Sequence, residues 1–435
     1  MRLRRLVWLL LIVILAAGGG FVWHSQQAVI DGIERPAASS FDQKLVEAGA
    51  KLAAVGNCRH CHTARGGSEY AGGVGIATPF GTIYSSNITP APGTGLGRWP
   101  EAAFVRAMRQ GISRRGQHLY PAFPYDHYTE LSDADLHALY AFLMTRAPVE
   151  NFVPANELPF PMNQRWTMAF WNALFFKERR FATDPQHDAV WNRGAYLVSG
   201  LAHCGACHTP RNFAGAERKD QALSGGEVDG WHAPALNASS PAPVPWDANH
   251  LSSYLHQGWD DRHGAAAGPM QAVTEALAHA DPADIKAIST YVASLQAPPS
   301  PERQKRAEQA LSRAAESVAP EPSGAAEAFG ATLFNGACAA CHIGNKPTTP
   351  RHGIDLSLSS ALSDADPRNA IMILLDGIRP RPEQTGPWMP AFRNTLTDPQ
   401  LAALLQYLRA HYGPGSAWSG LEGKVRAARE RGQRS

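Results

Sequence analysis

The sequence contains little cysteine and little net charge, and it has only one long apolar run. Its 435 residues include six cysteines, and 40 basic residues nearly balance 38 acidic ones, which leaves a formal net charge of +2. This small excess argues against nucleic-acid binding, which is usually accompanied by a strongly basic surface. The sequence also lacks a phosphate-binding loop, a dinucleotide-binding motif and a nucleophile elbow. We therefore expect any oxidation of an organic substrate to belong to another polypeptide.

All six cysteines fall into three copies of the pattern C-x-x-C-H, which is the attachment signature of c-type haem. In such a motif the two thiols add to the two vinyl groups of the haem, and the histidine binds iron from the proximal side. The pattern predicts three covalently attached c-type haems. The cysteine pairs are Cys58 and Cys61, Cys204 and Cys207, and Cys338 and Cys341, and the histidines are His62, His208 and His342.

Other uses of these cysteines fit the sequence less well. A thioredoxin-like pair needs a βαβ context and does not require the histidine. A zinc site would need two further ligands at short range, and no second C-x-x-C lies near any of the motifs. A chain of this length has no need of a disulfide framework to stabilise its core.

The chain also repeats a longer unit around each motif. A Gly-Ala phrase at Gly49, Gly194 and Gly330 precedes the cysteines, and an amphipathic helix with an aromatic residue closes each unit. The aromatic residues are Phe142, Tyr291 and Tyr407. Because glycine has no side chain, we expect each ring-bearing helix to approach the glycine backbone closely. The capping residue Ser132, followed by Asp135, predicts where the first of these helices begins.

This arrangement resembles the class I cytochrome c domain, in which the first and last helices cross over the haem. It predicts an all-α fold with three such domains in tandem after an N-terminal transmembrane or signal helix. The expected segments are 1–25 (anchor or signal), 41–150 (first domain), 151–188 (aromatic-rich connector), 189–297 (second domain), 298–325 (Pro-rich linker), 326–412 (third domain) and 413–435 (basic tail).

The sixth iron ligands decide between electron transfer and ligand binding. Met270, which follows Gly-Pro, and Met389, which precedes Pro, lie ahead of the closing helices of the second and third units. Methionine sulfur is a usual distal ligand in cytochromes c, so we expect both to bind iron. The first unit has Phe123 where methionine is expected. We rank His127 first among the substitutes, ahead of His118 and Met108, and the alternative is a five-coordinate haem.

The N-terminus begins with residues 1–5 (MRLRR), and an apolar run from Leu6 to about Trp23 follows. A basic start before an apolar run is typical of an export signal or of an anchor. Because the run is near the lower limit for spanning a bilayer, both interpretations stay open, and we favour the anchor. The arginines would remain cytoplasmic, and the rest of the chain would be exported.

Residues 192–197 (NRGAYL), 207–212 (CHTPRN) and 171–176 (WNALFF) complete a wider resemblance. With the three motifs, they resemble the tri-haem cytochrome c subunits of bacterial membrane-bound dehydrogenases. The resemblance implies a catalytic dehydrogenase partner of molybdopterin, PQQ or flavin type, an acceptor that is ubiquinone or a terminal oxidase, and the periplasmic side of the inner membrane. Because it has Phe123 in place of methionine, the chain more closely resembles the nicotinate-dehydrogenase-type molybdenum hydroxylase branch of this family. The competing hypothesis is a peroxidase-like haem enzyme or a gas sensor with an open haem in the first domain.

Overall fold

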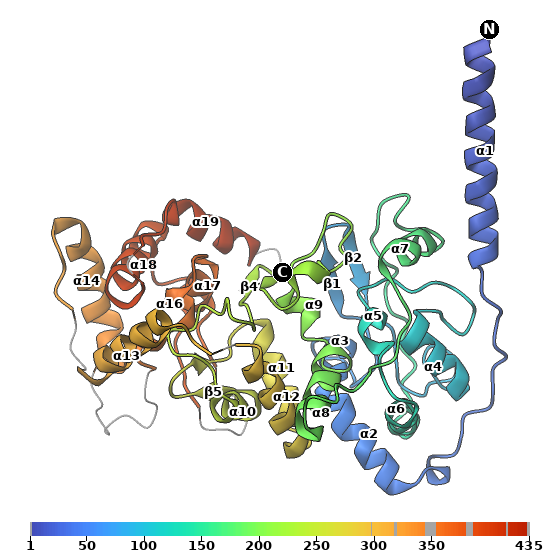
Figure 1. Cartoon of the computed structure of the whole chain (residues 1–435), viewed down its shortest axis with the longest axis horizontal. Coiled ribbons are helices and arrows are strands. Elements are labelled where there is room, and N and C mark those ends of the chain that lie inside the picture. The colour runs from blue at the N-terminus through green and yellow to red at the C-terminus, as the bar shows by residue number, and fades with distance from the viewer. Residues whose placement is uncertain are drawn as a thin grey trace. The chain divides into compact units, whose positions relative to one another are not determined.

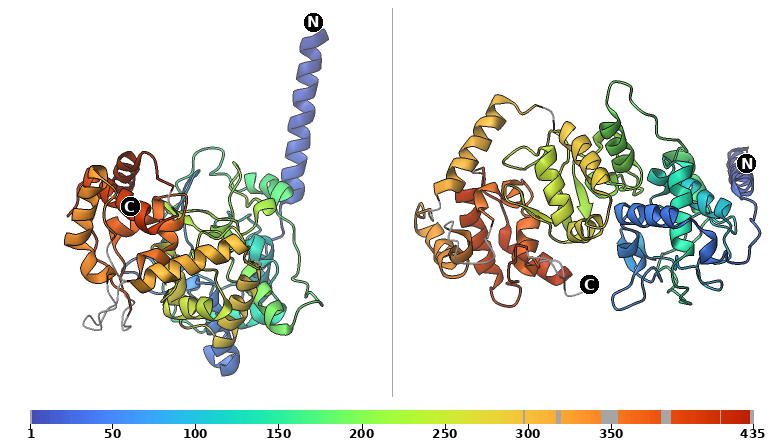
Figure 2. Two further views of the ribbon diagram at one scale, coloured as in Figure 1. Left: turned by 60° about the vertical axis from the view of Figure 1, so that its left-hand side comes forward. Right: turned by 90° about the horizontal axis from the view of Figure 1, so that it is seen from below.

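The structure is a computed structural model that describes residues 2–296, 298–316, 320–343, 354–379, 386–414 and 416–432 (Figures 1 and 2). The chain forms two compact units. Unit 1 comprises Met1–Ala182 with Ser199–His203 and Ala214–Ala216, and unit 2 comprises Thr183–Val198, Cys204–Phe213 and Glu217–Ser435. The first motif lies in unit 1, and the core of unit 2 contains the second and third motifs.

Helices make up about half of the chain, and the part of it that the structure describes also has three short antiparallel hairpins. The all-α prediction therefore holds for the helical framework and omitted these hairpins. The elements of unit 1 are α1 (Arg2–Ser25), a 3-10 turn (Ala38–Ser40), α2 (Gln43–Val55), α3 (Cys58–His62), β1 (Gly75–Thr78), β2 (Gly81–Tyr84), α4 (Glu101–Gln110), α5 (Tyr125–Tyr128), α6 (Asp133–Met144) and α7 (Thr167–Phe175).

Unit 2 begins with α8, whose last residue belongs to unit 1, and it ends with α19. Its helices are α8 (Ala189–Ser199), α9 (Gly205–His208), α10 (Ala248–Gln257), α11 (Pro269–Leu277), α12 (Pro282–Ser294), α13 (Pro301–Glu316), α14 (Ala325–Ala337), α15 (Ala339–His342), α16 (Ser360–Ser363), α17 (Arg368–Asp376), α18 (Asp398–Tyr412) and α19 (Leu421–Arg431). Its strands and 3-10 turns are β3 (Gly226–Val228), β4 (Trp231–Ala233), β5 (Trp259–Asp260), β6 (Gly264–Ala265), Lys219–Gln221 and Leu356–Leu358.

A glycine lies at the crossing of three helix pairs, as the repeated Gly-Ala phrase predicted. A Cβ atom added to any of these glycines would lie only 2.0 to 2.5 Å from a carbonyl oxygen of the partner helix. The same atom would lie 2.7 to 2.8 Å from the Cβ of the aromatic residue. Contact this close is open only to glycine, so the prediction is confirmed. The sets are Gly49 with Ala138 and Phe142 (α2 and α6), Gly194 with Ala287 and Tyr291 (α8 and α12), and Gly330 with Ala403 and Tyr407 (α14 and α18).

Side chains at the N-termini of the closing helices fix where they begin. Ser132 accepts a hydrogen bond from the amide of Asp135 at the start of α6, as expected from the sequence. Asp281 caps α12 in a similar way, and Thr397 forms a reciprocal capping box at α18. These caps satisfy amide groups that the helix itself leaves unpaired.

The Pro-rich segment 298–325 contains a regular helix, α13. It packs on the second and third motif-bearing segments, which are 189–297 and 326–412; residues 41–150 are called the first segment below. Ala307 and Ala310 of α13 are buried against Val244 and Leu358. Part of the expected Pro-rich linker is therefore a packed helix, because small alanines at a three-residue spacing give it one face that can be buried.

Candidate haem-attachment sites

Each motif forms a single helical turn that brings its two thiols to one side. In the second motif the amide of His208 donates to the carbonyl of Cys204 at 3.0 Å, and in the third His342 donates to Cys338 at 3.1 Å. The first motif is itself the short helix α3. Residues three apart lie on the same face of a helix, so both sulfurs can reach one planar group. None of the six cysteines, all within the described residues, forms a disulfide.

The thiols do not have the properties of a redox pair. Burial first, and the neighbouring cysteine second, raise the pKa of Cys58 and of Cys204 to about 12. The pKa of Cys338 is raised to about 11 by the same causes. Reactive thioredoxin-like cysteines have a lowered pKa, because the thiolate is the nucleophile. The structure therefore argues against the redox alternative and leaves the cysteines as attachment points.

The three motif histidines share one hydrogen-bonding arrangement. The Nδ1 atom of His62 lies 2.7 Å from the carbonyl of Ser86, that of His208 lies 2.7 Å from Pro234, and that of His342 lies 2.9 Å from Ile354. A carbonyl only accepts, so Nδ1 carries the proton and Nε2 keeps its lone pair. Burial lowers the pKa of all three imidazoles, which keeps them neutral. A neutral ring oriented through Nδ1 is the usual form of a metal-ligating histidine.

The same backbone hydrogen bond occurs in the distal loops of the first and second segments, so residues of the two loops can be matched. Helices α4 and α10 both end at a glycine with positive φ, Gly111 (64°) and Gly258 (83°). The carbonyl of Gly111 accepts from Leu119 at 2.7 Å, and that of Gly258 accepts from Ala266 at 2.8 Å. Phe123 and Met270 each lie four residues beyond these amides. Phe123 therefore has the same position in the chain, relative to this hydrogen bond, as Met270 has in the second segment.

Met270 and Met389 lie half-buried in turns held by close packing. Met270 is in the first turn of α11, and a Cβ on the preceding Gly268 would lie 2.3 Å from the Trp231 ring. Met389 forms a bridge with Ile378 through two backbone hydrogen bonds of 2.8 and 3.0 Å. Both thioethers are thus presented from fixed backbone, as a ligand would need to be.

His127 lies on α5 and not in an open loop. Its ring is buried, and its Nδ1 lies 2.6 Å from the carbonyl of Ser199, which fixes the same tautomer as in the motif histidines. His118 instead lies 3.2 Å from the carbonyl of Ser25 through Nε2, and Met108 is buried within α4. Assignment of His127 to iron stays a prediction.

Tyr128 is a residue near the first motif that sequence reasoning missed. Burial raises its pKa well above the usual value, and the charges of Cys58 and Cys61 raise it further. The Tyr128 ring also contacts Phe123, with ring centres 5.3 Å apart. Its phenol therefore lies near the thiols of Cys58 and Cys61 and beside the ring of Phe123, which stands where methionine was expected. Nothing in the sequence distinguishes it from the neighbouring Tyr125.

A second missed residue is His263, in the turn of the β5–β6 hairpin. It is 5% exposed and stacks on Trp246 with ring centres 3.5 Å apart. Neither of its ring nitrogens has a hydrogen-bond partner among the described residues. Burial, followed by the nearby charge of His250, lowers its pKa to about 3, so the imidazole is neutral. An orphaned polar ring in a buried site fits a missing polar group, such as a haem propionate.

Polar contacts join the scaffolds of the second and third motifs within unit 2. His232 lies 2.8 Å from Asp364 through Nδ1, and it exchanges backbone-to-amide hydrogen bonds of 3.0 and 2.7 Å with Asn369. Two residues later along the chain, the carbonyl of Pro234 accepts from His208. Arg368 pairs with Glu227 at 2.9 Å. The strand that orients the second histidine is therefore fixed to the third segment.

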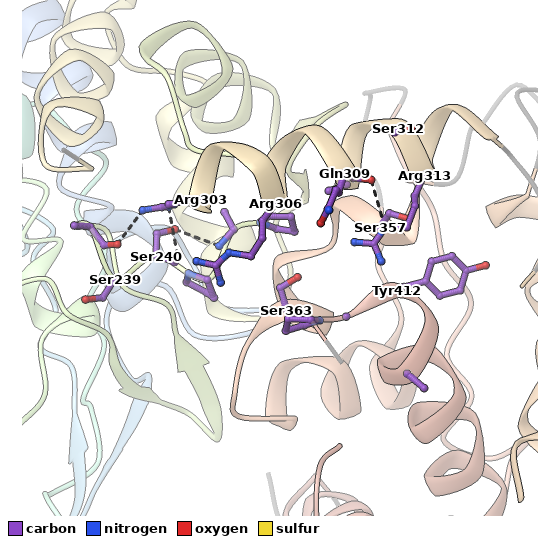
Figure 3. Close-up of a pocket in the computed structure, with 18 residues that line it drawn as sticks. Ser239, Ser240, Arg303, Arg306, Gln309, Ser312, Arg313, Ser357, Ser363 and Tyr412 are labelled. Atoms are coloured by element: carbon purple, nitrogen blue, oxygen red, sulfur yellow. Dashed lines mark hydrogen bonds between the residues drawn. The ribbon is translucent and has the colours of Figure 1, made fainter. Parts of the chain in front are cut away.

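A groove of about 870 Å³ lies elsewhere in unit 2, between α13 and the segment around α16 and α18 (Figure 3). Arg303, Arg306 and Arg313 line it together with serine side chains. No motif residue and no candidate distal ligand is among its lining residues. The groove is thus separate from the attachment sites.

Comparison with protein families gives two matches that fall on the first and third segments. A model described as "Cytochrome c" matches residues 46–147, and one described as "Cytochrome C oxidase, cbb3-type, subunit III" matches residues 325–408. These spans contain the first and third motifs and their glycine crossings.

Several relatives match nearly the whole chain. A nicotinate dehydrogenase subunit of Pseudomonas putida is 44% identical over 411 residues, which are 93% of this chain and 33% of that protein. The gluconate 2-dehydrogenase cytochrome c subunit of Pantoea cypripedii is 37% identical, with 86% of each chain covered. The fructose dehydrogenase cytochrome subunit of Gluconobacter japonicus is 36% identical, with 88% of this chain and 82% of that protein covered. The chain thus spans about a third of the nicotinate dehydrogenase subunit and most of the other two.

Proposed function

Because this chain belongs to the cytochrome c subunits of dehydrogenase complexes, we propose that it holds three c-type haems and conducts electrons from a catalytic dehydrogenase subunit to ubiquinone or a terminal oxidase. The observation that carries the haem number is the threefold recurrence of one site. Each motif has two thiols on one turn, a histidine held through Nδ1 on a backbone carbonyl, and a helix crossing closed by glycine. If the chain held only one or two haems, we would expect at least one motif to lack this geometry, and none does.

A bound haem supplies a one-electron couple, and the chain sets its surroundings. Cys58 and Cys61, with their counterparts in the other motifs, would hold the ring, and the Nε2 atoms of the motif histidines would face iron. Met270 and Met389 would supply sulfur to the second and third haems, which favours higher potentials. In the first segment His127 would supply nitrogen in place of sulfur, which lowers the potential of that site relative to the others.

His263 would complete the second site. Its N–H would donate to a haem propionate, while the face of its ring rests on Trp246. This contact accounts for a buried imidazole that has no other partner in the described chain.

We place the chain on the periplasmic side of the inner membrane. Helix α1 contains a stretch, Leu3–Trp23, that is long and apolar enough to span a bilayer, and none of its side chains that the structure describes is buried. Arginines before this stretch favour a cytoplasmic start. The identity with the nicotinate dehydrogenase subunit favours a molybdenum hydroxylase as partner over PQQ or flavin enzymes. The substrate would then be a small N-heteroaromatic compound.

The test is the haem content of the exported, purified chain. Pyridine haemochrome absorbance and intact mass should both give three haems per polypeptide. Two haems or fewer would contradict the proposal. Affinity purification of the chain from its native membrane should bring down a larger subunit, and metal analysis of that complex should show molybdenum.

A second candidate function is ligand binding at the first haem, because Phe123 stands where the second segment has Met270. If the iron is open there, the reduced protein should bind carbon monoxide rapidly at one haem. If His127 binds iron, the protein should not react, and His127→Ala should make one haem reactive. A His127→Ala protein that stays unreactive, like its parent, would remove His127 from the ligands.

A further inference from the structure

Helix α7 is apolar on both of its long faces. Met168 and Trp171 point inward and are buried with Tyr120 and Tyr125 in one cluster of unit 1. On the other face, Trp166, Phe170 and Leu174 follow at four-residue spacing from just before the helix, and they are 43%, 38% and 75% exposed. A helix that is apolar all round is normally covered on all sides. We call these three side chains the α7 stripe.

The α7 stripe is continuous with the end of the apolar helix α1. The ring of Phe21, in the last turns of α1, stacks on Phe170 with ring centres 4.7 Å apart. Phe170 in turn contacts Trp166 edge-on at 6.1 Å. Within unit 1, α7 lies beside the lower end of α1 (Figure 1). Trp23, which follows on α1, is 79% exposed.

The composition of this region is that of a membrane boundary. Tryptophan and other aromatic rings gather where hydrocarbon meets lipid headgroups, and basic side chains extend from there toward water. Trp23 and Trp166 supply such rings. The exposed Lys177 follows the stripe and is such a basic side chain. A single exposed aromatic residue would need no explanation, but an apolar stripe that extends a spanning helix does.

We propose that the α7 stripe lies in the outer interfacial layer of the bilayer that α1 crosses. The proposal rests on the anchoring role of α1 stated above. Unit 1 would then contact the membrane at two places, one spanning and one lying flat. Two contacts fix orientation, whereas a single helix leaves the unit free to rotate about its axis.

This orientation has a consequence for the first haem site. Phe123, in the distal loop of that site, packs on the same cluster that the inner face of α7 joins. The α7 stripe and the distal loop are thus separated by one helix, whose diameter is about 10 Å. The first site would be held close to the membrane surface, within reach of a lipid-soluble acceptor.

Photocrosslinking of the full, haem-loaded chain tests the proposal. The chain is reconstituted in vesicles of phosphatidylethanolamine and phosphatidylglycerol, with benzoylphenylalanine replacing one residue at a time. The positions are Leu174 on the stripe, Leu9 on α1 as positive control, and the exposed Lys44 on α2, also in unit 1, as negative control. Mass spectrometry should find lipid adducts at positions 174 and 9 in similar yield, several times the yield at 44.

The outcomes separate the proposal from its premise. Adducts at position 9 without adducts at 174 would overturn the α7 contact and leave the anchor intact. Absence of adducts at both positions would overturn the anchor as well. In native membranes, a crosslink from position 174 to a protein in place of lipid would show that a partner protein covers the stripe, and this would also overturn the proposal.

Discussion

Gly330→Ala tests whether the glycine crossings hold the fold together. Gly330 lies where α14 meets α18, and an added Cβ would lie 2.5 Å from the carbonyl oxygen of Ala403 and 2.7 Å from the Cβ of Tyr407. Gly336 lies on the same helix, and a Cβ there would meet nothing within 4 Å. Gly336→Ala is therefore a control with the same chemical change on the same helix.

The two variants share one effect and differ in the other. Replacing glycine by alanine in a helix gains about 0.5–1 kcal/mol, because the unfolded chain loses backbone freedom. Both variants receive this gain. At Gly330 the new methyl group meets backbone, so the helices must separate, and overpacking of this kind costs about 1–3 kcal/mol. The difference in stability between the variants should therefore be about 1–3 kcal/mol, with Gly330→Ala the less stable protein.

Amide hydrogen exchange read by peptide mass spectrometry measures this difference where it arises. The opening free energy of α18 peptides, from Asp398 to Tyr412, should fall in Gly330→Ala and hold or rise in Gly336→Ala. Peptides of α6 in unit 1 serve as an internal reference and should not change. Equal protection of α18 in the two variants would refute the claim that the third crossing depends on glycine.

Three further predictions concern single side chains. Met389→Ala should change the absorption spectrum of one haem and leave the others unaltered, and an unchanged spectrum would remove Met389 as a ligand. His263→Phe keeps the stacking on Trp246 but removes the donor to a propionate. A hydrogen bond changes a potential only by the difference between its strengths in the two oxidation states, so a bond of ~1 kcal/mol sets an upper limit of about 40 mV. Redox titration should show one midpoint potential lowered within this limit, and three unchanged potentials would exclude the contact. The hydrogen bond that His232 donates to the Asp364 carboxylate raises the pKa of His232 above its ordinary value of 6.5. This pair therefore stabilises unit 2 fully below about pH 6.5 and loses that contribution as pH rises through the higher folded pKa. Hydrogen exchange of α17 peptides should show this loss in the parent and not in His232→Asn.

The repeated parts of the fold could be predicted because each depends on a short stretch of sequence. The C-x-x-C-H motif contains its own turn, so Cys204 and His208 are placed by local hydrogen bonds. Glycine at a helix crossing is also visible, since Gly194 has a counterpart ahead of each of the other motifs. The start of α6 followed from Ser132, because a capping side chain acts within three residues.

Other parts depend on partners far apart in the chain, and the sequence does not show them. His263 is orphaned only because of the way in which its hairpin packs on Trp246. Tyr128 was missed because its nearness to Cys58 and Cys61 arises from tertiary packing. The packing of α13 was not predicted, because the prolines and charged residues around Ala307 and Ala310 give segment 298–325 the composition of a linker. The distal residue of the first haem stays a prediction, since Phe123 removes the usual sulfur without identifying a replacement.

The contacts of the β3–β4 hairpin limit how far this chain can be treated as a set of interchangeable modules. Removing everything after the second motif's closing helix would strip Asp364 and Asn369 from His232 and Arg368 from Glu227. The indole of Trp231, which packs on the core of the third segment, would be uncovered as well. A shortened, two-site descendant of this protein would have to acquire new side chains along that hairpin before it could fold as well as its parent, whereas the sequence motifs alone suggest a simple cut.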